Sequence, residues 1–275
     1  MVLPLAVDGL HQQILLNLDP LFLAVVLLPL VIGVIWFLPP LATLLMVEVV
    51  AFLAYREYVA LASGFGANLF RGFTLIGVGA TVAAAPYGMV VFVLISASLV
   101  LAAASLATGR SGGKTLLDIA SSMFALLYLG LPLGTLVAVN ALAGREAVVL
   151  LLATIMVSDT AQYYGGRSFG RTPLSPAISP NKSVEGALCG AAAGVGLLSV
   201  YAPLALGLSS VFQRVLLGVV IVTLGVVGDL FESQLKRGAG VKDASALIPG
   251  HGGILDRIDS LLFAAPGFYL FLQFG

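Results

Sequence analysis

Four carboxylates stand in two closely spaced pairs in the last fifth of the chain. Asp229 and Glu232 are three residues apart at the end of one apolar segment, and Asp256 and Asp259 are three apart at the start of the last one. Side chains at this spacing share a helix face, and carboxylates at membrane depth normally face a cavity or a partner. Four of them would repel one another unless cations joined them, and their oxygens suit Mg²⁺, which takes its other ligands from water and substrate phosphates. The pairs predict a Mg²⁺ site, with salt bridges as the alternative role for Glu232 and Asp259.

A glycine-rich turn and a basic cluster lie beside these carboxylates. Gly252 and Gly253 follow His251, and consecutive glycine N–H groups can point at an anion. Four basic residues accompany the turn: Lys236, Arg237, Lys242 and Arg257. Carboxylates for a metal, a glycine turn and positive charge together indicate phosphate chemistry. Lys236 and Arg237 could instead be charged anchors after a membrane span, and His251 could be a structural hydrogen-bond donor.

A second polar stretch, residues 158–186, combines turn residues with the start of a helix. The residues before Glu185 predict a helix N-terminus, which is a site that binds anions. The candidates for substrate contact in this stretch are Arg167, Ser179, Asn181, Lys182 and Ser183. Capping of the helix by Ser183 or Asn181 is an equally good interpretation. Asp159 and Glu185 are further candidates, for orienting basic residues or for the metal shell.

The composition requires that these segments be positioned in a membrane. Hydrophobic residues make up 60% of the 275 residues and charged residues only 9%, whereas soluble domains carry about 25% charged residues. So few charges cannot cover a water-exposed surface, so lipid must solvate most of it. The single cysteine, Cys189, excludes an intramolecular disulfide and a cysteine metal cluster. We read it as a small residue in helix packing. The start of the chain lacks the pattern of a cleaved signal peptide.

Nine apolar segments approach the length of about 20 residues that a spanning helix needs. They are residues 21–38, 40–54, 73–88, 89–107, 116–142, 146–164, 184–206, 211–231 and 257–274. The segment 73–88 is short for a span, and residues 1–20 have the spacing of a helix that lies in the membrane interface. Small residues such as Gly190, Gly194 and Gly196 predict close helix packing.

The distribution of positive charge predicts the orientation of these spans. Eleven of the thirteen Lys and Arg residues lie in the loops after the second, fourth, sixth and eighth segments. Cytoplasmic loops are enriched in Lys and Arg, so these loops and the N-terminus should be cytoplasmic and the C-terminus outside. Both polar stretches then face the cytoplasm. We expect a multi-pass protein of the cell inner membrane.

The two polar stretches resemble the phosphatidate cytidylyltransferase (CDP-diacylglycerol synthase) family. The signature is matched by Ser233, Leu235, Lys236, Arg237, Lys242, Asp243, Ser245, Ile248, Pro249, His251, Gly252, Gly253, Ile254, Asp256, Arg257, Ile258 and Asp259. An upstream motif is matched by Asp159, Thr160, Gly165, Arg167, Ser179, Pro180, Lys182, Ser183, Glu185 and Gly186. The resemblance covers residues 158–260. The first 150 residues match only as generic hydrophobic spans.

The resemblance implies an enzyme that converts phosphatidate and CTP to CDP-diacylglycerol and pyrophosphate. It implies a divalent metal, in some members paired with a monovalent ion such as K⁺, at the positions of Asp229 and Asp256. Glu232, Asp259 and Asp159 are further candidate ligands, and Lys236 and Arg237 are candidate catalytic cations. The candidates for substrate binding are Lys182, Ser179, Asn181, Ser183, Arg167, Lys242, His251, Gly252, Gly253 and Arg257.

Together these observations predict an all-α membrane protein of about nine helices. Residues 1–115 would form N-terminal membrane helices without a specific motif, and residues 116–275 the catalytic region. A polar funnel should open to the cytoplasm for CTP and sideways to the lipid bilayer for phosphatidate. We expect no nucleic-acid partner, and the sequence is compatible with a homo-oligomer.

Two other functions fit parts of the pattern. A CTP-dependent polyprenol or phytol kinase would use a lipid alcohol and release CDP, but the complete signature argues against it. A cation-coupled transporter would carry charges near the middle of its helices, whereas most charges here cluster at one surface. Glu48, which lies within the second apolar segment, is an exception that neither reading explains.

Overall fold

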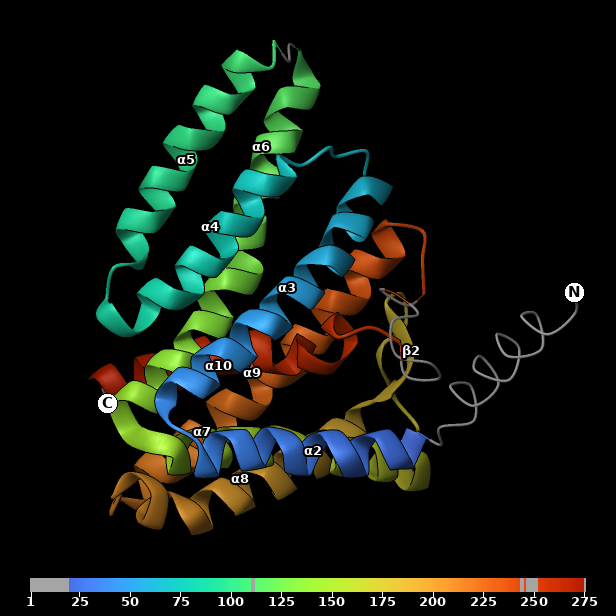
Figure 1. Cartoon of the computed structure of the whole chain (residues 1–275). Coiled ribbons are helices and arrows are strands. Elements are labelled where there is room, and N and C mark those ends of the chain that lie inside the picture. The colour runs from blue at the N-terminus through green and yellow to red at the C-terminus, as the bar shows by residue number, and fades with distance from the viewer. Residues whose placement is uncertain (1–19, 110–111, 243–244, 246–251, 275) are drawn as a thin grey trace, which may run out of the picture.

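The computed structural model describes residues 20–109, 112–242, 245 and 252–274. Within them the chain is built from helices and one short hairpin (Figure 1). The helices are α2 (Pro20–Phe37), α3 (Pro40–Gly64), α4 (Arg71–Ala84), α5 (Val90–Ala107), α6 (Gly113–Ala125), α7 (Leu131–Phe169), α8 (Val184–Leu206), α9 (Val211–Gly238) and α10 (Leu255–Phe274). Short helical turns at Ala85–Tyr87 and Leu126–Gly130 join α4 to α5 and α6 to α7. The segment 1–20 predicted for the interface lies, except for Pro20, outside the described residues.

Each predicted apolar segment coincides with helical structure, and the segment 116–142 spans most of α6, the helical turn after it and the start of α7. The predicted break between residues 142 and 146 falls inside α7, where Gly144 has a non-helical backbone with φ 82° and ψ 178°. Only glycine adopts such a φ without strain, so the chain turns there between two apolar segments. The predicted break therefore agrees with the structure, whereas α3 extends to Gly64 and α9 to Gly238, beyond the predicted ends at residues 54 and 231.

The apolar surface of the helices identifies a membrane protein. Four helical segments of the described chain are long and apolar enough to cross a membrane: Val90–Ala107, Gly113–Phe169, Val184–Leu206 and Val211–Gly238. Large apolar side chains such as Phe37, Leu106 and Leu204 are more than four-fifths exposed. In water such exposure would be unfavourable, whereas lipid solvates these side chains. The all-α membrane class is confirmed, and the count of nine spans stays a prediction.

A small hairpin follows α7 in the stretch that we expected to be a loop. Strands β1 (Pro173–Ser175) and β2 (Ser179–Ser183) pair antiparallel, and β2 leads directly into α8. The hairpin lies at the same end of the molecule as the described residues that lead into α10 (Figure 1). The fold thereby brings the two polar stretches together.

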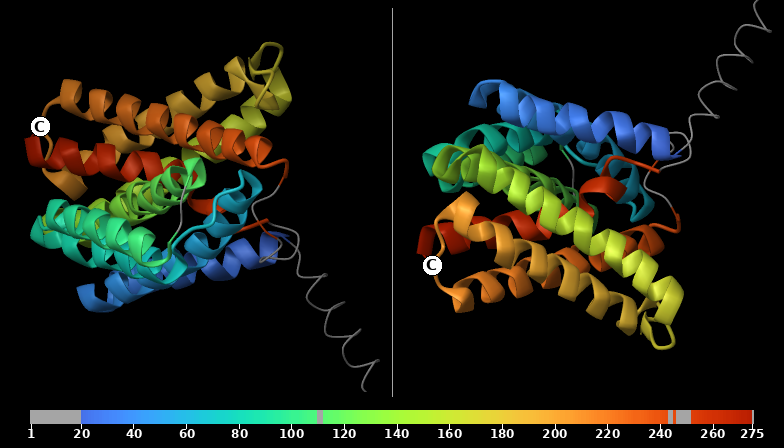
Figure 2. Two further views of the ribbon diagram at one scale, coloured as in Figure 1. Left: turned by 90° about the horizontal axis from the view of Figure 1, so that it is seen from above. Right: turned by 90° about the horizontal axis from the view of Figure 1, so that it is seen from below.

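Helices α7 to α10 pack on one another, and small residues set how closely they approach. Gly190 of α8 lies so close to α7 that a β-carbon there would come within 2.8 Å of the Ser158 carbonyl oxygen. A β-carbon on Gly194 would lie 3.1 Å from the Ser158 side chain, and one on Gly165 of α7 would collide with Cys189. A β-carbon on Gly196 would meet nothing within 4 Å apart from the backbone of its own helix. The predicted close packing is therefore confirmed for Gly190 and Gly194 and wrong for Gly196, which lies on the open face of α8. Figure 2 shows α2 and α8 on opposite sides of α7.

Candidate active site

One polar cavity of about 710 Å³ lies where the hairpin meets the ends of four helices. Its walls come from α7, β2, α8, α9 and α10. Ten of the predicted site residues line it: Asp159, Arg167, Ser179, Asn181, Lys182, Ser183, Asp229, Lys236, Asp256 and Asp259. The fold therefore gathers residues that are up to 100 positions apart in the sequence around one space.

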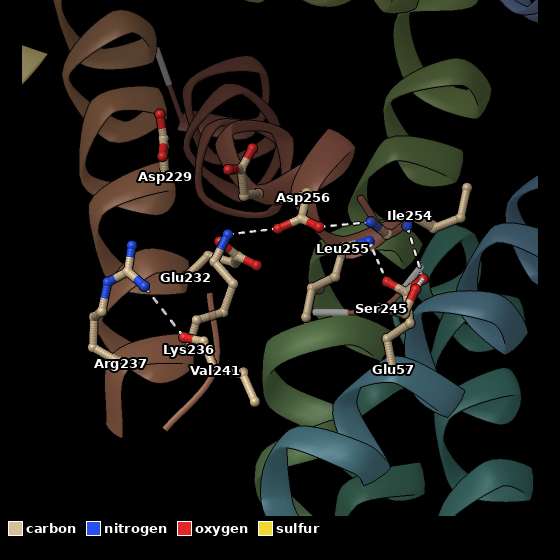
Figure 3. Close-up of polar contacts among 12 residues, drawn as sticks. Glu57, Asp229, Glu232, Lys236, Arg237, Val241, Ser245, Ile254, Leu255 and Asp256 are labelled. Atoms are coloured by element: carbon tan, nitrogen blue, oxygen red, sulfur yellow. Dashed lines mark hydrogen bonds and ion pairs between the residues drawn. The ribbon is translucent and has the colours of Figure 1, made fainter. Parts of the chain in front are cut away.

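Two lysines pair with the carboxylates of this cavity. Lys182 of β2 pairs with Asp229 of α9. The Lys236 ammonium lies 2.5 Å from Asp256 Oδ1 and 2.5 Å from Glu232 Oε2 (Figure 3). Glu232 is fully buried, so its ion pair with Lys236 offsets the cost of burying the charge. This contact corresponds to the salt-bridge alternative for Glu232, and a metal role for it stays a prediction.

The glycine turn binds Asp256, a carboxylate of the same signature. The Gly253 N–H donates to Asp256 Oδ2 at 2.6 Å. Gly252 has φ +76°, and a β-carbon there would lie 2.5 Å from the same oxygen, so both the conformation and the space require glycine. The predicted N–H donor of the turn thus meets the Asp256 carboxylate, an anion supplied by the chain itself. His251 lies outside the described residues.

The start of α8 separates the two interpretations of Ser183. Its hydroxyl accepts from the Gly186 N–H at 3.1 Å, which is an N-cap contact. Ser183 also lines the cavity, as does Asn181, which lies in β2 and is exposed. Glu185 accepts from the backbone N–H groups of Arg171 and Thr172 at 3.0 and 3.1 Å. Glu185 therefore holds the chain between α7 and the hairpin, and its role in orienting basic residues or a metal stays a prediction.

Three predicted basic residues lie outside the cavity. Arg237 is exposed and donates to the Val241 carbonyl oxygen at 3.3 Å. Lys242 is exposed beside it. Arg257 lines a separate, mostly apolar groove of about 460 Å³ between α2, α3, α7 and α10. The two spaces share Asp159, so the polar cavity and the apolar groove adjoin there.

The carboxylates of the cavity are of the chemical type that binds hard cations such as Mg²⁺. Asp159, Asp229, Asp256 and Asp259 line the wall against the ammonium groups of Lys182 and Lys236, and carboxylate oxygens are the ligands that Mg²⁺ prefers. As these side chains stand, no three His, Cys, Asp or Glu residues in the described part of the chain are grouped so that they could hold an ion. The ammonium groups occupy the oxygens that a metal would use. Burial lowers the pKa of Lys182, which favours loss of the proton from its ammonium group.

Comparison with known proteins identifies the family. Residues 21–275 match the model of the cytidylyltransferase family. The chain belongs to this family. The family resemblance predicted from the two polar stretches is therefore confirmed, and the match extends over the N-terminal helices for which the sequence predicted nothing specific.

Several curated cytidylyltransferases are similar to this chain. The phosphatidate cytidylyltransferase of Helicobacter pylori (strain ATCC 700392 / 26695) is 38% identical over 156 residues, which cover 54% of this chain and 55% of the relative. That of Aquifex aeolicus is 38% identical over 154 residues, with 56% and 57% covered. Phosphatidate cytidylyltransferase 5, chloroplastic, of Arabidopsis thaliana is 45% identical over 133 residues, with 47% and 32% covered. The chain spans about half the length of the first two relatives.

The cytidylyltransferase fold also brings to this region residues that sequence reasoning missed. Ser158, Gln162, Tyr163 and Ser260 are neighbours of predicted residues, and the last three line the cavity. Glu57 of α3 is buried and contacts the start of α10. A signal for Glu57 was present, because it is a carboxylate near the end of an apolar segment, as Asp229 is. Its distance of almost 200 residues from the signature concealed its partner.

Proposed function

We propose that this chain is a phosphatidate cytidylyltransferase, which converts CTP and phosphatidate to CDP-diacylglycerol and pyrophosphate. The observation that carries the proposal is the polar cavity, in which the upstream motif and the signature face each other with both carboxylates and lysines. The relatives with this name support it. Two polyanionic substrates must meet in such a reaction, so groups that neutralise charge are the main requirement.

The proposed chemistry is nucleotidyl transfer. A phosphate oxygen of phosphatidate attacks the α-phosphorus of CTP and forms a new P–O bond. The bond from the α-phosphorus to the bridging oxygen breaks, and pyrophosphate leaves with the electron pair. Lys182, Lys236 and Arg167 line the cavity and would bind phosphate oxygens of the two substrates. The nucleophile is already ionised near neutral pH, since the second pKa of a phosphomonoester is about 6. No general base is needed.

We place Mg²⁺ at Asp229 and Asp256, with K⁺ as a second ion. Asp159, Glu232 and Asp259 are the further candidate ligands. When bound, a divalent ion supplies positive charge to the phosphate oxygens of the transition state. Binding at these oxygens would require Lys182 and Lys236 to leave the carboxylates, which would free both ammonium groups for the substrates. Arg237 and Lys242, exposed at the end of α9, would contact CTP at the mouth of the cavity.

The adjoining apolar groove suits the lipid substrate. Its lining is formed mostly by apolar side chains of α2, α3, α7 and α10, and it meets the polar cavity at Asp159. Arg257 belongs to the same groove and would attract the lipid phosphate. This groove would be the sideways opening of the funnel, while CTP enters from the cytoplasm. The proposal includes nine spans, an inner-membrane location and a cytoplasmic N-terminus.

A labelled-substrate assay tests the proposal. Purified protein in detergent receives phosphatidate, Mg²⁺ and CTP labelled with ³²P at the α-phosphate. We expect label in CDP-diacylglycerol and release of unlabelled pyrophosphate. Label that enters lipid only from γ-labelled CTP, with a lipid alcohol as the acceptor, would identify a kinase instead. Cation flux without CTP consumption would identify a transporter.

A further inference from the structure

A buried carboxylate of the N-terminal half holds the first turn of α10. Glu57 lies on α3 and is 4% exposed. Its Oε1 accepts from the Ser245 hydroxyl at 2.6 Å and from the Ile254 N–H at 2.9 Å, and its Oε2 accepts from the Leu255 N–H at 2.7 Å (Figure 3). Both oxygens therefore act as acceptors, and the donors belong to the signature segment or to its direct neighbours.

These contacts meet a need that every helix has. The first N–H groups of a helix have no partner within it, and a carboxylate near them also interacts favourably with the helix dipole. Most helices obtain such a partner from the residue that precedes them. Here Glu57 supplies it from 198 residues away in the sequence. Because the carboxylate belongs to α3, it fixes the start of α10 relative to a different helix.

The turn that Glu57 holds carries Asp256, one of the two principal carboxylates of the cavity. Asp256 directly follows Leu255, and it binds the Gly253 N–H and the Lys236 ammonium. A β-carbon on Gly253 would collide with the Glu57 carboxylate, so the close approach of the two segments also depends on that glycine. A shift of the turn would move Asp256 relative to Lys236 and Asp229.

We propose that Glu57 is a positioning residue that holds the first turn of α10 and thereby orients Asp256 for nucleotidyl transfer. The effect on catalysis rests on the proposed function, whereas the effect on the turn does not. A displacement of about 1 Å can lower a rate about a hundredfold. Loss of Glu57 should therefore reduce kcat and leave the KM for CTP within about threefold, because Glu57 does not line the cavity.

The test compares Glu57→Gln with a matched buried acid. In Glu57→Gln the side-chain NH₂ group replaces one acceptor oxygen. It would face an N–H or O–H donor that the Glu57 carboxylate accepted from, and that hydrogen bond would be lost. Asp118→Asn is the control, since Asp118 is also buried and accepts a backbone N–H, that of Asn68 at 2.7 Å, but lies outside the cavity. Turnover is measured well below the Tm of each variant, and hydrogen exchange is followed by mass spectrometry over residues 252–258.

We expect Glu57→Gln to lose about ten- to a hundredfold in kcat and to exchange the amides of Ile254 and Leu255 faster. Asp118→Asn should keep wild-type values of both.

If Glu57→Gln does not fold, Glu57→Asp decides, because its shorter side chain cannot reach both amides. Turnover within threefold of wild type, or equal losses in the Glu57 and Asp118 variants, would overturn the role in catalysis. Unchanged exchange would overturn the contact itself. A wild-type protein that makes no CDP-diacylglycerol would refute the proposed function, and the exchange result would still decide whether Glu57 holds the turn.

Discussion

Each of the two principal carboxylates of the cavity is matched with its own lysine. Asp229 pairs with Lys182 of the hairpin, and Asp256 pairs with Lys236 of α9. Removal of a carboxylate therefore has two consequences, since it removes a candidate metal ligand and leaves a lysine without this partner. Both consequences disfavour binding of phosphate groups in a defined geometry.

Asp229→Asn and Asp256→Asn should each reduce turnover at least about a hundredfold, because several kcal/mol of charge stabilisation would be lost with the ion. The measurement is the rate of CDP-diacylglycerol formation as a function of Mg²⁺ concentration. Glu146→Gln is the control, since Glu146 is an exposed carboxylate that lies outside the cavity and pairs with its neighbour Arg145 at 3.4 Å. Near-normal, Mg²⁺-dependent turnover in either aspartate variant would refute the metal assignment.

Lys236→Met should destabilise the protein, because Glu232 would keep a buried charge without compensation. Glu232 has no exposed surface, and within the described chain its oxygens have no hydrogen-bond partner beyond the ion pair with Lys236. Breaking a buried pair costs about 3–5 kcal/mol. The double variant Lys236→Met/Glu232→Met removes both charges and should regain most of the stability, but not the activity. Unfolding in detergent measures the effect, and equal stability of the single variant and the wild type would contradict it.

At the scale of the elements, the spacing of α7 and α8 controls the shape of the cavity. Helix α7 contributes Asp159 and Gln162 to the wall, and α8 contributes Ala187. The glycines of α8 that face α7 let the two backbones approach closely. A larger side chain at this contact would widen the cavity, whereas the same change on the open face would not.

Gly190→Ala should lower both the Tm and the turnover, since the added carbon would come within 2.8 Å of the Ser158 carbonyl oxygen. Overpacking of this kind costs about 1–3 kcal/mol. Gly196→Ala is the matched control on the same helix, with no atom within 4 Å, and it should be neutral or slightly stabilising. Thermal unfolding and CDP-diacylglycerol formation are measured for both. Equal effects of the two substitutions would show that close packing of α7 and α8 is not required.

At the scale of the whole molecule, the connections rich in Lys and Arg gather at one end. The α3–α4 connection lies against the end of α9, because a β-carbon on Gly64 would lie 2.9 Å from the Ala239 carbonyl oxygen. In Figure 1 this connection lies toward the upper right, the C-terminal end of α5 at the top and the hairpin at the right. The α4–α5 and α8–α9 connections lie toward the opposite side, as does the C-terminal end. The orientation of these two sides across the membrane stays a prediction.

Cysteines placed at Ser111 and Ser175 should be shielded from an impermeant thiol reagent added outside intact cells, because both positions belong to predicted cytoplasmic loops. Cys189 is first replaced by Ala so that no native thiol reacts. A cysteine at the exposed Ser209, between α8 and α9, should be labelled and serves as the positive control. Labelling of both Ser111 and Ser175 positions from outside would reverse the orientation.

The sequence alone determined the membrane class, the helical segments, the family and most of the cavity lining. These properties are local, since an apolar segment of sufficient length forms a helix in lipid whatever surrounds it, and a signature is read directly from adjacent residues. The hairpin, the pairing of Lys182 with Asp229 and the contact of Glu57 with α10 were decided only by the tertiary structure. The two side-chain contacts join residues 47 and 198 positions apart, and which charged groups meet depends on how the helices pack. A buried carboxylate needs a partner, but the sequence does not state which segment will supply it.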